Sequence, residues 1–309
     1  MIELREVVKT YGGRRVVDAV TLTVGEGEVC ALIGSSGSGK STTLKMINRL
    51  VEMNSGVIEV AGEDTGRLPV EALRRRIGYV IQSVGLFPHW TVADNIATVP
   101  RLLNWPRARI AARVDEMLAL VRLDAREFAG KYPHELSGGQ QQRVGVARAL
   151  AGDPDVLLMD EPFGALDPIT RTALRDEFAR IHETTKKTIL FVTHDMDEAL
   201  TLADRVAIME EGRIVQADAP RAILASPATA FVRDLIGMSE LGLKRLSVER
   251  VASRVRAGET APGESIAAAS SLRDALSRMI ERRTDRLAVR DEGGAIAGVI
   301  HLRDIVDRQ

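Results

Sequence analysis

A glycine-rich turn between an apolar run and a helical pattern constrains the fold more than any other feature of this chain. The apolar residues Val29 to Ile33 are followed directly by Gly34-Ser35-Ser36-Gly37-Ser38-Gly39-Lys40-Ser41. This run fits the pattern GxxxxGK[ST], in which a strand, a loop and a helix follow one another. Its glycines allow successive backbone N–H groups to surround a polyphosphate, and the helix N-terminus adds partial positive charge. The sequence therefore predicts an α/β fold with a phosphate-binding loop at this point.

Two side chains of this loop are predicted to contact the ligand. We expect Lys40 to reach the β and γ phosphates and the Ser41 hydroxyl to bind Mg²⁺. A glycine-rich turn without a ligand is the alternative, and the strand before the loop and the helix after it disfavour that alternative. The loop alone does not specify the nucleotide base.

An acidic strand end supplies the second half of the predicted phosphoryl-transfer site. The apolar run Val156 to Met159 ends in Asp160 and Glu161, and Pro162 follows. Asp160 is placed to hold Mg²⁺ through water, and Glu161 to polarise the attacking water. Adjacent carboxylates at a strand end are solvated surface charges when they occur alone. The phosphate loop upstream favours the catalytic interpretation here.

A histidine closes another apolar run, Thr188 to Val192, which we expect to be a covered parallel strand. His194 lies at the edge where α/β sheets bind their ligands. There it would contact the γ-phosphate or the attacking water. A surface or packed histidine is the alternative that the residue pattern leaves open.

Residues 136–144 read LSGGQQQRV and form a second candidate anion site. Ser137, Gly138 and Gly139 precede a helix that is expected to begin near Gln140, so they offer a hydroxyl, backbone N–H groups and a helix dipole. One chain cannot easily fold this segment onto its own phosphate loop. A second copy of the chain can bring it there, so the sequence predicts two nucleotide-handling surfaces that meet across a dimer.

This combination of motifs resembles the nucleotide-binding subunit of an ABC transporter, over roughly residues 1–235. The resemblance implies that the nucleotide is ATP, hydrolysed with Mg²⁺ in a head-to-tail homodimer. Each ATP would lie between one subunit's phosphate loop and the other subunit's Ser137 to Gly139. Closure of the dimer would move the helices of transmembrane permease subunits, and an external solute-binding protein would act indirectly.

The resemblance also assigns roles to single residues. Tyr11 corresponds to the aromatic that stacks on adenine, and Gln82 to the glutamine that touches Mg²⁺ and couples to the membrane partner. Gly164-Ala165-Leu166-Asp167 corresponds to a loop that communicates across the dimer. Glu161 and His194 match the catalytic glutamate and the switch histidine. The full set of ATP-binding residues implied in this way is Tyr11, Gly34, Ser35, Ser36, Gly37, Ser38, Gly39, Lys40, Ser41, Thr42, Gln82, Ser137, Gly138, Gly139, Gln140 and Asp167, with Ser41, Gln82 and Asp160 as the Mg²⁺ ligands.

The periodicity of apolar residues predicts how the chain is organised. We expect a P-loop NTPase core of the ABC type, with an N-terminal antiparallel β subdomain and a helical insertion at about 87–151. After residue 235 a linker at 236–245 leads to a small α+β unit at 246–309. Strands are predicted at 2–8, 16–24, 56–60, 156–159, 188–192, 287–289 and 297–300, and a helix at 271–283.

The segment Gln82-Ser83-Val84-Gly85-Leu86-Phe87-Pro88-His89-Trp90-Thr91-Val92 resembles importers of quaternary-ammonium osmoprotectants such as glycine betaine, carnitine and choline. Its apolar and aromatic residues suit a surface that receives a helix of the permease. Ordinary core packing of Leu86 or Phe87 is the alternative. An importer of another small solute, or a soluble adenosine-nucleotide sensor that works through its C-terminal unit, also stays open.

The C-terminal residues resemble a cystathionine-β-synthase (CBS) motif. The stretch from Ser271 to Leu276 precedes Leu287 to Val289 and then Gly298 to Ile305. In adenosine-binding members the aspartate at position 304 contacts a ribose, but a histidine, His301, stands at the hydroxyl position here. Because one motif is present per chain, we expect the two chains of the dimer to supply one each. Arg282, Arg283 and Arg286 are predicted either to contact anionic lipid and sense ionic strength, or to form a solvated helix face.

Composition excludes several classes of partner. The formal net charge is −1 and the pI about 6.6, so the overall charge does not recruit nucleic acid. Nothing approaches the roughly 18 to 20 apolar residues that span a bilayer. We therefore expect a cytosolic polypeptide held at the cytoplasmic face of the membrane by the permease. The single Cys30 is predicted to be a buried, inert thiol.

Overall fold

The computed structural model describes residues 1–82, 85–164, 167–237, 240–291 and 293–306. The chain forms two compact units, Met1–Ala219 and Pro220–Gln309. The second unit begins earlier than the boundary at residue 235 that the motifs suggest, because the short helices after residue 219 pack with the C-terminal residues. The boundary near residue 235, where the sequence resemblance ends, stays a prediction.

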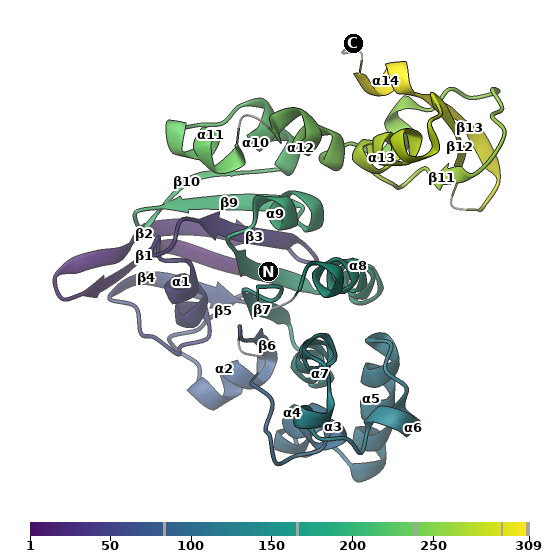
Figure 1. Cartoon of the computed structure of the whole chain (residues 1–309). Coiled ribbons are helices and arrows are strands. Elements are labelled where there is room, and N and C mark those ends of the chain that lie inside the picture. The colour runs from purple at the N-terminus through teal and green to yellow at the C-terminus, as the bar shows by residue number, and fades with distance from the viewer. Residues whose placement is uncertain (83–84, 165–166, 238–239, 292, 307–309) are drawn as a thin grey trace. The chain divides into compact units, whose positions relative to one another are not determined.

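A six-stranded sheet, ordered β10-β9-β3-β8-β7-β6, carries the phosphate loop (Figure 1). Its central strands pair in parallel, and only β10 at one edge runs antiparallel. Every residue of β3, β7 and β8 is buried, as expected for parallel strands that are covered on both faces. The strands of this sheet are β3 (Val29–Gly34), β6 (Ile77–Val80), β7 (Val156–Asp160), β8 (Thr188–Thr193), β9 (Arg205–Glu210) and β10 (Arg213–Asp218).

A four-stranded antiparallel sheet, ordered β2-β1-β4-β5, confirms the predicted N-terminal β subdomain. One apolar core contains side chains of both sheets and of helix α1. Cys30 lies in this core, which confirms the expected buried thiol, and burial raises its pKa to about 12. The elements of this region are β1 (Ile2–Tyr11), β2 (Arg14–Val24), α1 (Lys40–Ile47), β4 (Ser55–Val60), β5 (Glu63–Asp64) and α2 (Val70–Arg76).

The predicted helical insertion is present between β6 and β7, and its helices gather in one group beyond the edge strand β6, against which α7 packs (Figure 1). Helix α7, which like α5 has 14 residues, packs against α3, α4 and α5. Two further helices, α8 and α9, flank β8 in the sequence and belong to the same compact unit. The helices are α3 (Val92–Ile96), α4 (Thr98–Leu102), α5 (Arg107–Leu120), α6 (Ala125–Phe128), η1 (Pro133–Glu135), α7 (Gly138–Ala151), α8 (Pro168–Thr185) and α9 (Met196–Leu202).

The second unit contains a three-stranded sheet, ordered β11-β12-β13, with its own apolar core. The expected strands and the helix at 271–283 are present. Helix α12 begins at Leu241, inside the segment 236–245 that the sequence assigns to a linker, and packs against α10 and α13. The elements are α10 (Pro220–Ala225), α11 (Ala230–Ile236), α12 (Leu241–Val248), η3 (Val251–Arg254), β11 (Ser265–Ala267), α13 (Leu272–Arg282), β12 (Arg286–Arg290), β13 (Ile296–His301) and α14 (Leu302–Val306).

Candidate functional site

A cleft at the carboxyl ends of the parallel strands is lined by eight of the predicted site residues. The loop after β3, the end of β7 and the end of β8 meet there because these strands are neighbours in the sheet. Sequence reasoning missed one lining residue, Val16, which belongs to β2 and carries no motif. The lining residues are Val16, Ser36, Gly37, Gly39, Lys40, Ser41, Thr42, Glu161 and His194.

Close backbone packing explains why the phosphate loop needs glycine at two positions. Gly39 has φ of 106°, and a Cβ there would lie 2.5 Å from the carbonyl oxygen of Val16. At Gly34 a Cβ would lie 2.0 Å from the carbonyl oxygen of Met209. Only glycine fits both places without moving neighbouring backbone. The loop is thereby pressed onto β2 and β9, with Ser35, Ser36 and Gly37 at the exposed side.

Lys40 is almost fully buried, with 6% of its surface exposed. Its Nζ donates to the carbonyl oxygens of Gly34 at 2.9 Å and Ser35 at 2.8 Å, and approaches Ser38 Oγ at 3.4 Å. Burial lowers the pKa of the Lys40 ammonium, while Glu161 and Asp160 oppose this shift. The side chain is thus a desolvated positive charge at the base of the loop, which suits attraction of phosphate oxygens.

Ser41 and Asp160 contact each other across the cleft floor. The Ser41 hydroxyl donates to Asp160 Oδ1 at 2.8 Å, and Asp160 is 8% exposed. The two residues come from α1 and β7, which the fold brings together. A hydroxyl and a carboxylate side by side are oxygen ligands of the kind that Mg²⁺ prefers.

Glu161 lies in the cleft lining and contacts two other predicted residues. Gln82 Nε2 donates to Glu161 Oε2 at 2.9 Å, and His194 Nδ1 lies 3.5 Å from the same oxygen. His194 is 64% exposed by its side chain, so this histidine belongs to the cleft mouth and not to the core. Gln82 and His194, which the sequence proposed separately, therefore both contact the Glu161 carboxylate.

The LSGGQ segment forms the N-terminus of α7, which has a side-chain cap, whereas the phosphate-loop helix α1 has none. Ser137 is the N-cap of α7, which begins at Gly138, two residues before the expected start, because the Ser137 side chain accepts from Gln140 N. Gln140 Oε1 accepts from Ser137 N at 2.9 Å and completes a capping box. Ser137 and Gly138 are exposed, whereas Gly139 is buried. None of the described residues that line the cleft comes from this segment.

The remaining predicted residues lie at the ends of other elements. Tyr11 ends β1 with 49% of its surface exposed, and Lys9 Nζ lies 4.9 Å from its ring centroid. Asp167 precedes α8, and its Oδ1 accepts from Thr170 N at 3.1 Å. Ala165 and Leu166 of the predicted communication loop lie outside the described residues, as do Ser83 and Val84 of the segment after Gln82.

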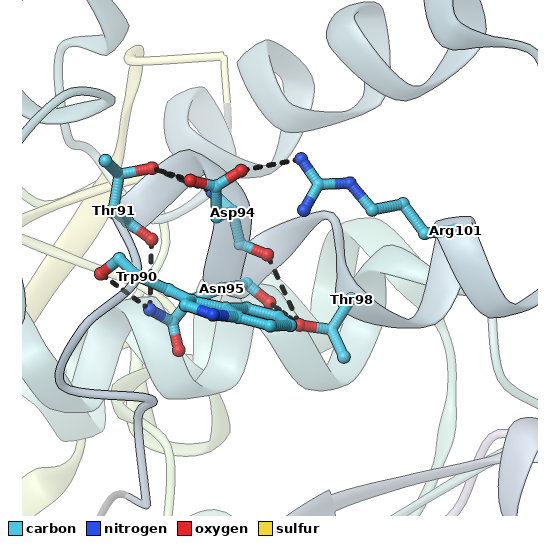
Figure 2. A network of polar contacts seen from close by, with 6 residues as sticks. All are labelled: Trp90, Thr91, Asp94, Asn95, Thr98 and Arg101. Carbon is cyan, nitrogen blue, oxygen red and sulfur yellow. Dashed lines mark hydrogen bonds and ion pairs between the residues drawn. The ribbon is translucent and has the colours of Figure 1, made fainter.

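The loop between Gln82 and α3 exposes two aromatic rings. Phe87 and Trp90 are 44% and 40% exposed, and their ring centroids lie 4.7 Å apart. The fully buried Asn95 fixes this loop, because its Nδ2 donates to the carbonyl oxygens of Phe87, Trp90 and Thr91 and its Oδ1 accepts from Phe87 N. Figure 2 shows Asn95 beside the Trp90 ring. Core packing therefore does not account for Phe87.

An ion pair next to Asn95 strengthens the start of α3. Thr91 Oγ1 donates to Asp94 Oδ2 at 2.7 Å and accepts from Asp94 N, so Thr91 caps the helix. Arg101 lies 2.6 Å from Asp94 Oδ1, and its hydrogen bond is the main cause of the lowered pKa of the Asp94 carboxyl (Figure 2). These contacts stabilise the helix start that follows the exposed aromatic pair.

In the second unit, Asp304 already has a charged partner. Arg256 approaches both carboxylate oxygens of Asp304, with Nε at 2.9 Å from Oδ2, and this contact lowers the pKa of the Asp304 carboxyl. His301 Nε2 lies 2.6 Å from Glu259 Oε2. Among the predicted arginines, Arg282 lies 3.1 Å from Glu264, and both side chains are mostly exposed.

Comparison with known proteins places this arrangement in a family. The chain is 55% identical over 306 residues to the glycine betaine uptake system ATP-binding protein YehX of Escherichia coli, covering 99% of each chain. The chain belongs to the ATP-binding subunits of ABC transporters. The subunits of this family are ATPases. A family model for ABC transporters matches residues 17–164, and one for the CBS domain matches residues 263–309.

Two further relatives of this ABC subunit extend the comparison. The glycine betaine/carnitine/choline transport ATP-binding protein OpuCA of Bacillus subtilis is 47% identical, over 99% of this chain and 79% of that protein. The dimeric post-hydrolysis structure of the ATP-binding cassette MJ0796 with ADP and Pi matches 71% of this chain and 99% of that chain, with 33% identity and a TM-score of 0.63. No helix in the described part of the ABC subunit is long and apolar enough to cross a membrane.

Proposed function

We propose that this chain hydrolyses ATP to drive the import of quaternary-ammonium osmoprotectants of the glycine betaine, carnitine and choline type. One observation carries the proposal. Lys40, Ser41 and Glu161 converge in one cleft, in a chain whose full-length relatives are named as ATP-binding proteins of such importers. ATP is the substrate of the cleft, and transport is the work to which its hydrolysis is coupled.

The residues of the cleft divide the chemistry among them. The loop amides and Lys40 hold the β and γ phosphates, with Tyr11 stacked on adenine. Glu161 accepts a proton from the attacking water, and its contacts with Gln82 and His194 orient the carboxylate. Ser41, Asp160 and the Gln82 amide oxygen are oxygen donors that fit Mg²⁺, which when bound neutralises phosphate charge.

A second copy of the chain completes each site. The exposed Ser137 and Gly138 begin α7 away from the residues that line the cleft of their own chain. Ser137 to Gln140 would therefore bind the nucleotide of the partner subunit in a head-to-tail homodimer, and Asp167 would lie near the dimer interface. The dimeric state named for the MJ0796 cassette supports this assembly.

The permease docks next to Gln82 in this proposal. The exposed Phe87 and Trp90 offer an apolar surface to a helix of the membrane partner, and Gln82 links that surface to Glu161. The subunit is then peripheral at the cytoplasmic face of the membrane. An external solute-binding protein acts on it only through the permease.

The test is to purify the chain with its membrane partner in lipid vesicles and measure ATP turnover with candidate solutes. Glycine betaine, carnitine or choline should stimulate turnover, and sulfate and amino acids serve as controls. Stimulation by a control solute alone would assign a different importer. A soluble nucleotide sensor is disfavoured because the Arg256 guanidinium already contacts both carboxylate oxygens of Asp304. Full ATP turnover without any response to a membrane partner would support that alternative.

A further inference from the structure

One side chain connects the LSGGQ helix to the catalytic turn within the same chain. Gln142 lies on α7, five residues after Ser137, and is 3% exposed. Its Nε2 donates to the carbonyl oxygen of Pro162 at 2.6 Å. The preceding glutamine, Gln141, instead donates to Leu136 O at the start of its own helix.

The surroundings of this hydrogen bond make it energetically important. Gln142 and Pro162 line a small apolar pocket together with Val146, Phe163 and Phe178. In such surroundings a hydrogen bond is electrostatically stronger than in water, and an unpaired carbonyl is costly. The position of Gln142 and that of the Pro162 peptide are therefore linked.

The acceptor is the carbonyl oxygen of Pro162, the residue that follows the catalytic Glu161 in the chain. Glu161 has φ of 47°, in the left-handed region, which a non-glycine residue keeps only where its neighbours fix it. Glu161 N donates to Val192 O at 3.0 Å, and Gly164 N donates to Glu161 O at 3.2 Å. These bonds come from β8 and from the turn itself. The hydrogen bond from Gln142 is a third contact on this turn, and its donor belongs to α7.

We propose that Gln142 is a positioning residue that makes the orientation of Glu161 depend on the placement of α7, and thereby couples the two ATP sites of the dimer. The inference rests on the proposed head-to-tail dimer. There, Ser137 binds the nucleotide of the partner's site, whereas Glu161 of the same chain serves its own site. Gln142 lies between these two residues, so nucleotide held by Ser137 in one site is sensed by Glu161 in the other.

Substitution of Gln142 tests the coupling in the full chain. Gln142→Glu keeps the shape and removes both N–H donors, and Gln142→Met gives a second, uncharged variant. Both should lower kcat by about tenfold, change KM for ATP by less than about twofold and bring the Hill coefficient for ATP to about 1. Gln216→Glu makes the same chemical change on β10, outside the cleft and the LSGGQ segment, and should leave all three values unchanged. Unchanged kcat and Hill coefficient in both Gln142 variants would overturn the proposal, provided that thermal melting shows them folded.

A mixed dimer separates positioning from general damage to α7. One protomer keeps Glu161 and hydrolyses ATP, and its differently tagged partner carries Glu161→Gln. Gln142→Glu in the hydrolysing protomer should reduce turnover about tenfold, because that Gln142 supports the working Glu161. The same change in the Glu161→Gln protomer should have little effect, although that protomer supplies Ser137 to the working site.

Equal losses in both arrangements would show that the substitution damages α7 itself, and would overturn the proposal. A loss confined to the Glu161→Gln protomer would overturn it as well, since Gln142 would then act through Ser137. If Glu161→Gln subunits with ATP formed no dimer at all, the proposed function would fail first, and the inference would fail with it. Dimer formation is read separately, by size-exclusion chromatography, so the two failures are distinguishable.

Discussion

The cleft of the first unit and the Asp304 cluster of the second unit each place an aspartate where the sequence suggests nucleotide binding, but their carboxylates have different partners. Asp160 accepts from the neutral Ser41 hydroxyl at 2.8 Å. Asp304 meets the guanidinium of Arg256 through both oxygens. A hydroxyl can share a carboxylate with a cation, whereas an arginine already neutralises it. The difference teaches that a motif position predicts a ligand only when the side-chain oxygens are still available to accept from it or to bind a cation.

The two regions also differ in how the site is completed. The cleft is lined by residues that follow three strand ends, and Gln82 and His194 contact its Glu161. It is open to solvent, so a ligand or a second chain can complete it. The Asp304 cluster is closed by side chains of its own unit. We therefore expect substitutions in the cleft to change catalysis, and substitutions in the Asp304 cluster to change stability.

The largest effect should come from Glu161→Gln. The amide cannot accept the proton of the attacking water, so turnover should fall by about 10² to 10⁴ while ATP binding persists. Hydrolysis assays and the size of the ATP-bound species by chromatography measure the two properties, and we expect a trapped dimer. Asp153→Asn, which alters an exposed carboxylate paired with Lys187, is the matched control. Turnover at the wild-type rate would remove Glu161 from the role of base.

Ser137→Ala should have the next largest effect. It removes the hydroxyl that is offered to the partner's nucleotide and weakens the capping box of α7. Turnover should fall by about 10² to 10³, because loss of one transition-state hydrogen-bond donor is worth that much. The affinity of the dilute monomer for ATP should not change, as measured by equilibrium titration. A monomer with weakened affinity would place Ser137 in its own chain's cleft and break the two-chain site.

Local patterns account for most of what the sequence predicted correctly. The strand, loop and helix around Lys40 and the acidic end of β7 are contiguous in sequence, and their apolar runs are fully buried strands. The contacts Gln142 to Pro162 and Arg256 to Asp304 join residues far apart along the chain, and no periodicity encodes them. Helix α12 begins inside the segment 236–245 that the sequence assigns to a linker, because Gly242 and a short apolar pattern give little local signal for a helix that tertiary packing stabilises.

A smaller effect, on stability and not on turnover, should follow from Arg256→Gln. The Arg256 guanidinium lowers the pKa of the Asp304 carboxyl below its ordinary value of 3.8. A carboxyl whose pKa is lower in the folded chain contributes stability above its unfolded pKa, and this contribution is lost as pH falls through the folded value. The melting temperature of the variant should therefore be lower than that of the wild type at pH 7, with the difference shrinking below pH 3.8.

Calorimetry across this pH range measures the difference, and ATP turnover at pH 7 should stay at the wild-type level. Arg278→Gln, which removes an exposed arginine from α13, is the control and should leave the pH profile unchanged. Tight AMP binding to the second unit of the wild-type chain, not displaced by ATP bound in the cleft, would contradict this account, in which Asp304 is paired with Arg256. A pH-independent difference in melting temperature would assign the effect of Arg256 to packing.

The smallest effect should come from Arg282→Gln, which tests whether the arginines of the second unit act as a lipid contact or a solvated face. The side chains of Arg282 and Glu264 are 56% and 68% exposed and lie 3.1 Å apart. An exposed pair of this kind contributes less than about 1 kcal/mol and is screened by salt, so the free energy of unfolding should change by less than about 0.5 kcal/mol. Binding of the chain to vesicles with and without anionic lipid, and turnover across a salt series, should match the wild type. A lost salt response in this variant, with stability unchanged, would mean that Arg282 acts on a charged surface outside the chain. The second unit would then contribute a binding surface of its own, in contrast to the paired carboxylate of Asp304.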